Sequence, residues 1–96
     1  MNSHPFTEYQ ARITKILKKN DVKKAGLFGS FARGEAKKNS DIDLVIEFRG
    51  KKSLFDLVGL KIELEESIHR NVDIVTYKSL HPLLKNKILA EQVPLL

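Results

Sequence analysis

Residues 29–44 read GSFARGEAKKNSDIDL, and this stretch decides the fold because it joins a glycine-serine turn to a pair of aspartates at a fixed spacing. Before it, the apolar run from Ala25 to Phe28 stops at Gly29, as a buried strand does when it ends in a tight turn. Ser30 suits the N-cap of a short helix, whose first backbone N–H groups have no partner within the helix. The sequence therefore predicts a strand, a turn and a short helix in this order.

The predicted turn has the features of a phosphate site. Unpaired N–H groups and the positive end of a helix dipole attract anions. Gly29 leaves space for a phosphate to approach the backbone, and the Ser30 hydroxyl can donate a hydrogen bond. Arg33, one turn further, could reach the same phosphate with its forked guanidinium, or could instead pair with Glu35 or Asp41. A glycine-serine turn alone is more often an ordinary connection, so the interpretation depends on the aspartates downstream of it.

Residues 41–48 read DIDLVIEF and alternate acidic and apolar side chains with a period of two. One face of this strand carries Ile42, Leu44, Ile46 and Phe48, so Asp41 and Asp43 lie side by side on the other. Two carboxylates this close repel each other unless a cation lies between them, and oxygen ligands of this kind suit Mg²⁺ or Mn²⁺. The alternative is a solvated face of an edge strand. We interpret the pair as metal ligands beside the phosphate site, which is the arrangement that nucleotidyl transfer needs.

A third acid lies on a second alternating strand. Residues 71–76 read NVDIVT, and Asp73 points to the face opposite Val72 and Ile74. If this strand pairs with the first, the three carboxylates converge. Asp73 would then ligate a metal ion and orient or deprotonate an attacking hydroxyl. Glu47, further along the first acidic strand, is interpreted as a surface carboxylate.

Gly29-Ser30, ten further residues, and then Asp41-Xaa-Asp43 resemble the signature of minimal nucleotidyltransferase domains, members of the DNA polymerase β-like superfamily. The resemblance extends over nearly the whole chain. It implies that Gly29 and Ser30 bind the triphosphate of ATP, and that Asp41 and Asp43 bind metal and catalyse. It also implies two Mg²⁺ ions, with Mn²⁺ as a substitute. Asp73 would be the third carboxylate. Arg33 would contact a phosphate, a role that matches the family pattern less closely.

Small domains of that family are often antitoxins encoded beside a HEPN-type RNase toxin, and some transfer AMP from ATP to a tyrosine hydroxyl of the toxin. The resemblance therefore implies a protein adenylyltransferase that forms a hetero-oligomer with a HEPN-domain toxin. A second hypothesis is a binding antitoxin that occludes its partner through apolar patches such as the tail at residues 93–96. A third is transfer to RNA ends, which the positive charge suggests and the lack of an RNA-holding domain opposes.

Length and composition limit the architecture. With 96 residues and 42% hydrophobic content, the chain is expected to form a single domain, residues 1–96. Seventeen Lys and Arg against twelve Asp and Glu give a net charge of +5, but the lysines are scattered pairs, so we expect a solvated surface and no nucleic-acid partner. The absence of cysteine excludes disulfides and thiolate metal sites. No stretch approaches the roughly 20 apolar residues of a membrane span, and residues 1–5 carry no signal pattern. We expect a cytoplasmic protein.

The expected fold is α/β, with a small mixed sheet of about three strands and about four helices that alternate with the strands, beginning with a helix. The first helix is expected at about residues 7–19, with Thr7 and Gln10 as a capping box. A longer helix begins at Ser53 and Asp56 and runs to about residue 69. Its expected buried residues are Leu54, Leu57, Val58, Ile62, Leu64 and Ile68. Gly59 within it is expected to allow close packing against the sheet.

The last helix is expected to be capped by Ser79, with Pro82 in its first turn. Four apolar side chains would pack it down, namely Leu83, Leu84, Ile88 and Leu89. The apolar tail at residues 92–96 is too short to assign, and it could form a strand fragment or part of a partner interface.

Overall fold

The alternating strands that the sequence predicts pair into one mixed sheet in the computed structural model, which describes residues 6–96. The sheet has four strands in the order β3-β2-β1-β4, namely β1 (Val22–Phe28), β2 (Ile42–Phe48), β3 (Val72–Thr76) and β4 (Val93–Pro94). Strand β1 pairs antiparallel with β2 and β4, and β2 pairs parallel with β3. The predicted α/β class and mixed sheet are confirmed. The predicted number of about three strands is one short, because the tail adds β4.

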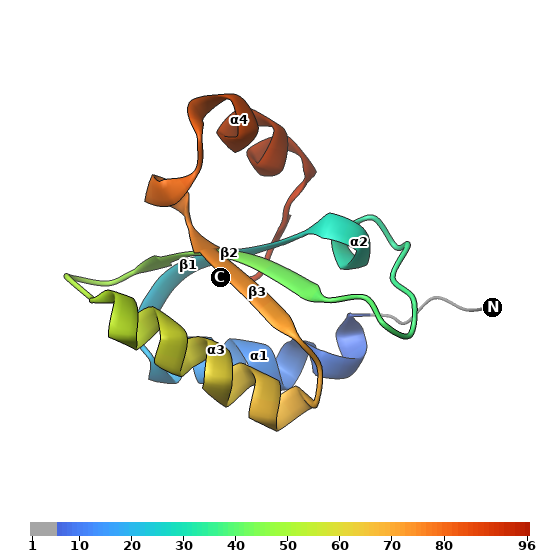
Figure 1. Ribbon diagram of the computed structural model, residues 1–96, viewed down its shortest axis with the longest axis horizontal. Helices are drawn as coiled ribbons and strands as arrows, with labels where there is room; N and C mark the ends of the chain where they lie inside the picture. The colour runs from blue at the N-terminus through green and yellow to red at the C-terminus, as the bar shows by residue number, and fades with distance from the viewer. Residues whose placement is uncertain (1–5) are drawn as a thin grey trace.

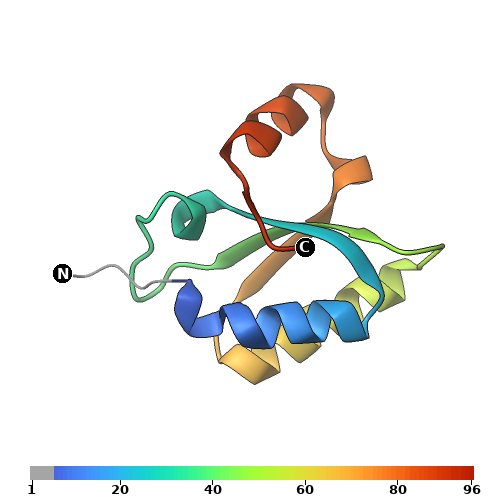
Figure 2. The same ribbon diagram turned by 180° about the vertical axis from the view of Figure 1, so that it is seen from behind.

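Four α-helices alternate with the strands in the predicted order: α1 (Thr7–Lys19), α2 (Gly29–Ala32), α3 (Leu54–Ile68) and α4 (Pro82–Glu91). A 3₁₀ turn, η1 (Tyr77–Ser79), follows β3. Helices α1 and α3 lie side by side on one face of the sheet, and α4 stands over the opposite face, as Figures 1 and 2 show from two sides. None of the helices within residues 6–96 is long and apolar enough to cross a membrane.

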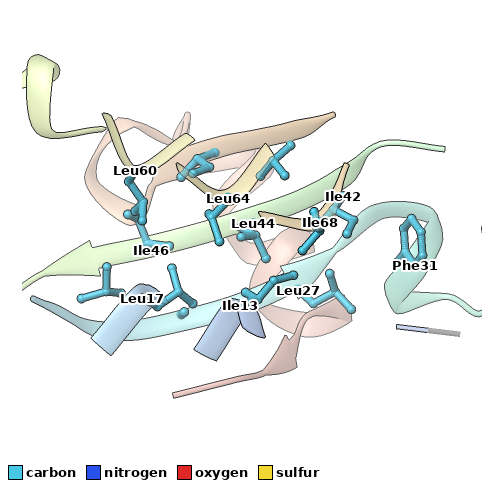
Figure 3. Packing of buried hydrophobic residues seen from close by; sticks show 14 of the residues in the cluster. Ile13, Leu17, Leu27, Phe31, Ile42, Leu44, Ile46, Leu60, Leu64 and Ile68 are labelled. Carbon is cyan, nitrogen blue, oxygen red and sulfur yellow. The ribbon is translucent and has the colours of Figure 1, made fainter. Parts of the chain in front are cut away.

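The hydrophobic core lies between the sheet and the pair α1 and α3 (Figure 3). Alternation in β2 turns Ile42, Leu44 and Ile46 toward these helices. Helix α1 contributes Ile13 and Leu17, four residues apart and therefore on one face. Each such side chain stabilises the fold by about 1.5–3 kcal/mol when it is fully buried. This face of the sheet holds the domain together.

The two predicted capping boxes have different outcomes. At α3 the box is confirmed: the Ser53 N–H donates to Asp56 Oδ2 (2.8 Å), and the Asp56 N–H donates to Ser53 Oγ (3.4 Å). At α1 it is wrong, because Phe6 occupies the N-cap without a side-chain hydrogen bond and Thr7 is already helical. The predicted bounds of α1 are nevertheless correct.

The predicted buried face of α3 is only partly correct. Leu64 and Ile68 are buried and Leu57 is half-buried, but the other three expected residues, Leu54, Val58 and Ile62, are exposed. The sequence holds two apolar stripes with helical spacing, and only one of them can face the sheet. Gly59 lies on the outward side, where an added Cβ would meet no atom within 4 Å. The prediction that Gly59 packs against the sheet is therefore wrong.

Helix α4 also differs from prediction. Its N-cap is His81, whose Nδ1 accepts from the Leu83 N–H (3.2 Å), whereas Ser79 ends the preceding 3₁₀ turn. Pro82 is at the first helical position, as predicted. The expected packing of Leu83 and Leu84 is wrong, since both are exposed and α4 has no fully buried residue.

The tail adopts the strand fragment that the sequence left as one of two possibilities. Val93 faces Leu27 and Pro94 faces Gly26 in the β1–β4 ladder. The Leu95 N–H then donates to the Ala25 carbonyl (2.8 Å). Both terminal leucines pack against the core, so the chain end at residues 93–96 closes the sheet edge along β1.

Candidate functional site

The register of the sheet brings the predicted site residues together. Asp43 on β2 lies directly opposite Asp73 on parallel β3, and opposite Phe28, the last residue of β1. Gly29 follows Phe28 and begins α2, so the glycine-serine turn adjoins Asp43. Asp43 alternates with buried Ile42 and Leu44, and its side chain therefore points away from the core.

Gly29 is the closest neighbour of Asp43 on the turn. Its φ is +76°, and an added Cβ would lie 2.2 Å from Asp43 Oδ2. Both the conformation and the space thus require glycine. Phe28, with an extended backbone, is the N-cap of α2, and its side chain makes no capping hydrogen bond. The prediction that Ser30 is the N-cap is therefore wrong: Ser30 is the second residue of α2, and its own N–H is among the first N–H groups, which have no partner within the helix.

Burial and nearby charges act together on the Asp43 carboxyl group. Partial burial, then the charge of Asp73, then that of Asp41 raise the pKa of Asp43 from 3.8 to about 6, while Arg33 opposes the shift. The neighbouring acids thus disfavour the ionised form of Asp43. A cation bound between them would remove this repulsion.

The donor set suits a magnesium ion that is shared with a substrate. Within residues 6–96, no three or more His, Asp or Glu side chains are arranged to hold a metal ion by themselves. Mg²⁺ usually keeps several waters and binds one or two carboxylates together with substrate phosphates, so a complete cage of side chains is not required. Asp41 and Asp43 would hold the ion, with Asp73 beside them.

Arg33 lies at the edge of this group. Its Nε donates to Glu35 Oε1 at 2.6 Å, and both side chains are exposed. The pairing with Glu35 that the sequence allowed as an alternative is therefore present. The Arg33 charge still acts on Asp43, so a phosphate that binds between them would compete with Glu35 for the guanidinium.

Arg70 is a site-supporting residue that the sequence did not reveal. Its Nη1 donates to the carbonyls of Ser40 (2.6 Å) and Lys38 (3.0 Å), just before Asp41. Its guanidinium also stacks on the rings of Tyr9 and Phe31, at 5.5 and 5.2 Å. One side chain thus links the loop that carries Asp41 to α2 and α1. Arginine at the end of a helix is typical of an ordinary turn, and no local pattern indicates these distant partners.

The other end of this sheet face is closed. Gly26 lies under Gln92, whose Oε1 would be 2.0 Å from an added Cβ, and Gln92 accepts a hydrogen bond from the Tyr77 hydroxyl (2.8 Å). Tyr77 is buried there, with the Lys24 ammonium 4.7 Å from its ring centroid. Gln92 and Tyr77 thus cover the part of this sheet face over Gly26.

Comparison with known proteins agrees with this geometry. The family model described as "Polymerase beta, Nucleotidyltransferase" matches residues 11–96. A Methanocaldococcus jannaschii protein that is provisionally named a protein adenylyltransferase is 54% identical over 91 residues, which are 95% of this chain and 98% of the relative. The protein adenylyltransferase MntA of Thermococcus cleftensis is 38% identical over 72 residues, 75% of this chain and 73% of its own.

A solved structure extends the similarity to a complex. A chain from a toxin-antitoxin crystal structure with AMP-PNP superposes with a TM-score of 0.81 at 25% identity. The match covers 91% of the present chain and 72% of that chain. The shared fold therefore includes the elements that carry the candidate site.

Proposed function

Because the chain belongs to the polymerase beta nucleotidyltransferase family, we propose that it transfers AMP from ATP to a tyrosine hydroxyl of a partner protein, in the cytoplasm. Its class is that of a nucleotidyltransferase, as the relatives named protein adenylyltransferases indicate. The observation that carries the proposal is the convergence of Gly29, Asp43 and Asp73 at one end of the sheet.

The turn and α2 would bind the triphosphate. Gly29 allows a phosphate oxygen to approach the backbone, and the first N–H groups of α2 and the Ser30 hydroxyl can donate to it. The ion pair between Arg33 and Glu35 is exposed and therefore weak, so Arg33 can bind a phosphate in place of Glu35. These contacts would fix the α-phosphorus over the carboxylates of β2 and β3.

The transfer reaction takes place at the α-phosphorus held over these carboxylates. The acceptor hydroxyl oxygen forms a bond to the α-phosphorus, and the bond from that phosphorus to the oxygen bridging the β-phosphate breaks. Pyrophosphate leaves with the electron pair. Asp73 orients the hydroxyl and accepts its proton. Asp41 and Asp43 would hold a divalent cation, and Mg²⁺ bound there would neutralise the phosphate charge and polarise the α-phosphate.

We propose a HEPN-type RNase toxin as the acceptor, with the chain as its antitoxin in a hetero-oligomer. The structural relative bound to AMP-PNP comes from a toxin-antitoxin complex. A protein substrate would approach the face that carries Asp43.

Neutralisation by binding alone is the second candidate. The expectation that the tail supplies the apolar contact does not fit, since Leu95 and Leu96 pack against the core. Exposed Leu83 and Leu84 on α4 offer a different apolar contact on the site side of the sheet. A binder of this kind would not depend on the carboxylates.

Intact-mass spectrometry of the partner toxin tests the proposal. A candidate HEPN-type toxin is incubated with the purified chain, ATP and Mg²⁺. We expect its mass to increase by one or more AMP units, and the increase to vanish when Asp41 and Asp43 are both replaced by Asn. Glu47→Gln, on the same strand as the aspartates, is the matched control and should leave transfer intact. A stable complex without any mass increase would reject transfer and support the binding candidate.

A further inference from the structure

Of the three acids in the candidate site, only Asp41 lies outside a strand. Asp43 and Asp73 are held within β2 and β3, but Asp41 precedes β2 and is exposed. No ion pair holds its carboxylate within residues 6–96. The position of this carboxylate is therefore decided by the backbone on either side of it. A metal site that needs Asp41 beside Asp43 also needs that backbone to be fixed.

Two consecutive residues, Arg70 and Asn71, fix the backbone on both sides of Asp41. On one side, Arg70 Nη1 donates to the Ser40 carbonyl (2.6 Å). On the other side, the Ile42 N–H donates to the Asn71 carbonyl (3.0 Å). The second contact belongs to the pairing of β2 with β3, whereas the first depends on a single side chain. Removing the guanidinium would therefore free the peptide before Asp41 and leave the strand pairing in place.

The guanidinium of Arg70 is itself held in place, so it can act as a rigid support. Its Nε donates to the Tyr9 hydroxyl (3.3 Å), and its central carbon lies 5.2 Å from the centroid of the Phe31 ring. Phe31 is buried and directly follows Ser30 in α2. The same guanidinium thus contacts the helix that would bind the triphosphate and the loop that carries Asp41. Arginine suits this task better than lysine, because its planar fork presents several donors in a fixed geometry.

We propose that Arg70 is the positioning residue of the metal site. Its hydrogen bond to the Ser40 carbonyl holds the Asp41 carboxylate where it can share one divalent cation with Asp43. This inference rests on the proposed function, because it assumes that the two aspartates bind the cation. Arg70 itself touches neither the cation nor ATP. It acts through the loop, as the outer hydrogen-bond partners of metal ligands do in other proteins.

The direction of the change in cation affinity separates positioning from two other roles of Arg70. A positive charge near a site repels a cation, so the loss of this charge alone should strengthen cation binding. Loss of positioning has the opposite effect, because the two carboxylates no longer bind the same ion. A general loss of stability predicts neither change while the variant is folded. The affinity for a divalent cation therefore discriminates among the three roles.

Titration with Mn²⁺, followed by the electron paramagnetic resonance signal of the free ion, measures this affinity without ATP and without transfer. We expect Arg70→Gln to weaken Mn²⁺ binding by about tenfold. Arg70→Lys keeps the charge and can donate to one carbonyl, so it should retain part of the affinity. The matched control is Ile46→Val, which removes one buried methylene group at the other end of β2 and lowers stability, but should bind Mn²⁺ like the wild type. Circular dichroism verifies that each variant is folded during the titration.

Asp41→Asn separates a failure of this inference from a failure of the proposed function. It should weaken Mn²⁺ binding at least as much as Arg70→Gln. If Asp41→Asn binds Mn²⁺ like the wild type, or if the wild type binds none, the metal site itself is wrong and the inference falls with it. If Asp41→Asn loses binding while Arg70→Gln binds as tightly as the wild type or more tightly, only the positioning role is overturned. Equal weakening in Ile46→Val would also overturn it, because stability would then set the affinity.

Discussion

The two faces of the sheet differ in the roles of their side chains, and β2 shows the difference between two adjacent residues. Leu44 points to α1 and α3, is fully buried and belongs to the core. Asp43 points the other way, where partial burial and two neighbouring acids disfavour its charge. The first residue stabilises the fold and the second opposes it. Stability and chemistry are therefore assigned to opposite sides of one strand, and substitutions should separate them.

The sign of the Asp43 effect is set by its pKa. In the folded chain the pKa is raised from 3.8 to about 6. A carboxyl group with a raised pKa binds protons more tightly in the folded state, so stability decreases as the pH rises through this interval. At neutral pH the ionised side chain therefore destabilises the fold. An acidic residue whose ionised form destabilises the fold is typical of a functional site.

The largest expected effect is that of Asp43→Asn on activity. The change removes a ligand charge and almost no volume, and we expect AMP transfer to fall by roughly 1,000-fold or more. The melting temperature measured without divalent cations should stay equal or rise, because the repulsion from Asp73 and Asp41 is removed. Glu47→Gln, two alternations along the same face, should keep transfer within about twofold. Full transfer by folded Asp43→Asn would reject the assigned site.

Leu44→Ala should have the opposite profile. Removing a fully buried leucine from the core is expected to lower the free energy of unfolding by about 2–5 kcal/mol. Urea unfolding measures the loss. Leu83→Ala on α4 is the control, since an exposed leucine should change stability by no more than about 0.5 kcal/mol. Equal losses in the two variants would mean that α4 is packed after all.

Gly29→Ala tests a residue on which both the stability of the fold and the geometry of the candidate site depend. The positive φ of this residue alone should lower the free energy of unfolding by about 1–3 kcal/mol. The new methyl group would also displace the Asp43 carboxylate, which lies 2.2 Å from the position of the added Cβ. We expect a loss of transfer larger than the loss of stability explains, measured at a temperature where the variant is folded. An active Gly29→Ala would argue against the close approach of this turn to Asp43.

Arg70→Gln should loosen the loop before Asp41. The variant loses charged hydrogen bonds to two carbonyls, and we expect a stability loss of about 1–2 kcal/mol. Limited trypsin digestion provides the specific readout, because cleavage after Lys37 and Lys38 should become faster in the folded variant. Arg12→Gln, which removes a single long hydrogen bond to the Ser67 carbonyl (3.3 Å), is the control and should not change cleavage in this loop. Unchanged cleavage in Arg70→Gln would mean that the loop is held by other contacts.

Sequence-based prediction succeeded where one short pattern has one physical solution. The alternation of residues 41–48 predicted that Ile42, Leu44 and Ile46 face the core, and all three are buried. The glycine-serine turn upstream predicted the short helix between two strands, and α2 lies there. The convergence of Asp43 with Asp73 was expected once the two strands were taken as neighbours, and the register confirms it. The roles of these residues as ligands and catalysts stay a prediction.

Sequence-based prediction failed where a pattern is compatible with two local structures, or where a residue contacts others that are distant in the sequence. Helix α3 carries two apolar stripes, and only the sheet geometry selects the one that is buried. Capping of α4 by His81 instead of Ser79 depends on how the chain leaves η1. The contacts of Arg70 with the loop before Asp41 join residues thirty or more positions apart, so no local pattern contains them. Each of these errors concerns helices and loops rather than the strands.

The smallest expected effect has a positive sign and tests the outward face of α3 directly. Gly59→Ala should raise the free energy of unfolding by up to about 1 kcal/mol, because alanine loses less backbone freedom on folding and its Cβ meets open space. Gly34→Ala is the matched control: its Cβ is equally free, but the φ of +72° disfavours alanine, so this variant should be destabilised. Both are measured by thermal unfolding under the same conditions. Destabilisation by Gly59→Ala would instead mean that Gly59 is packed within the domain, in contradiction to the open space around its position.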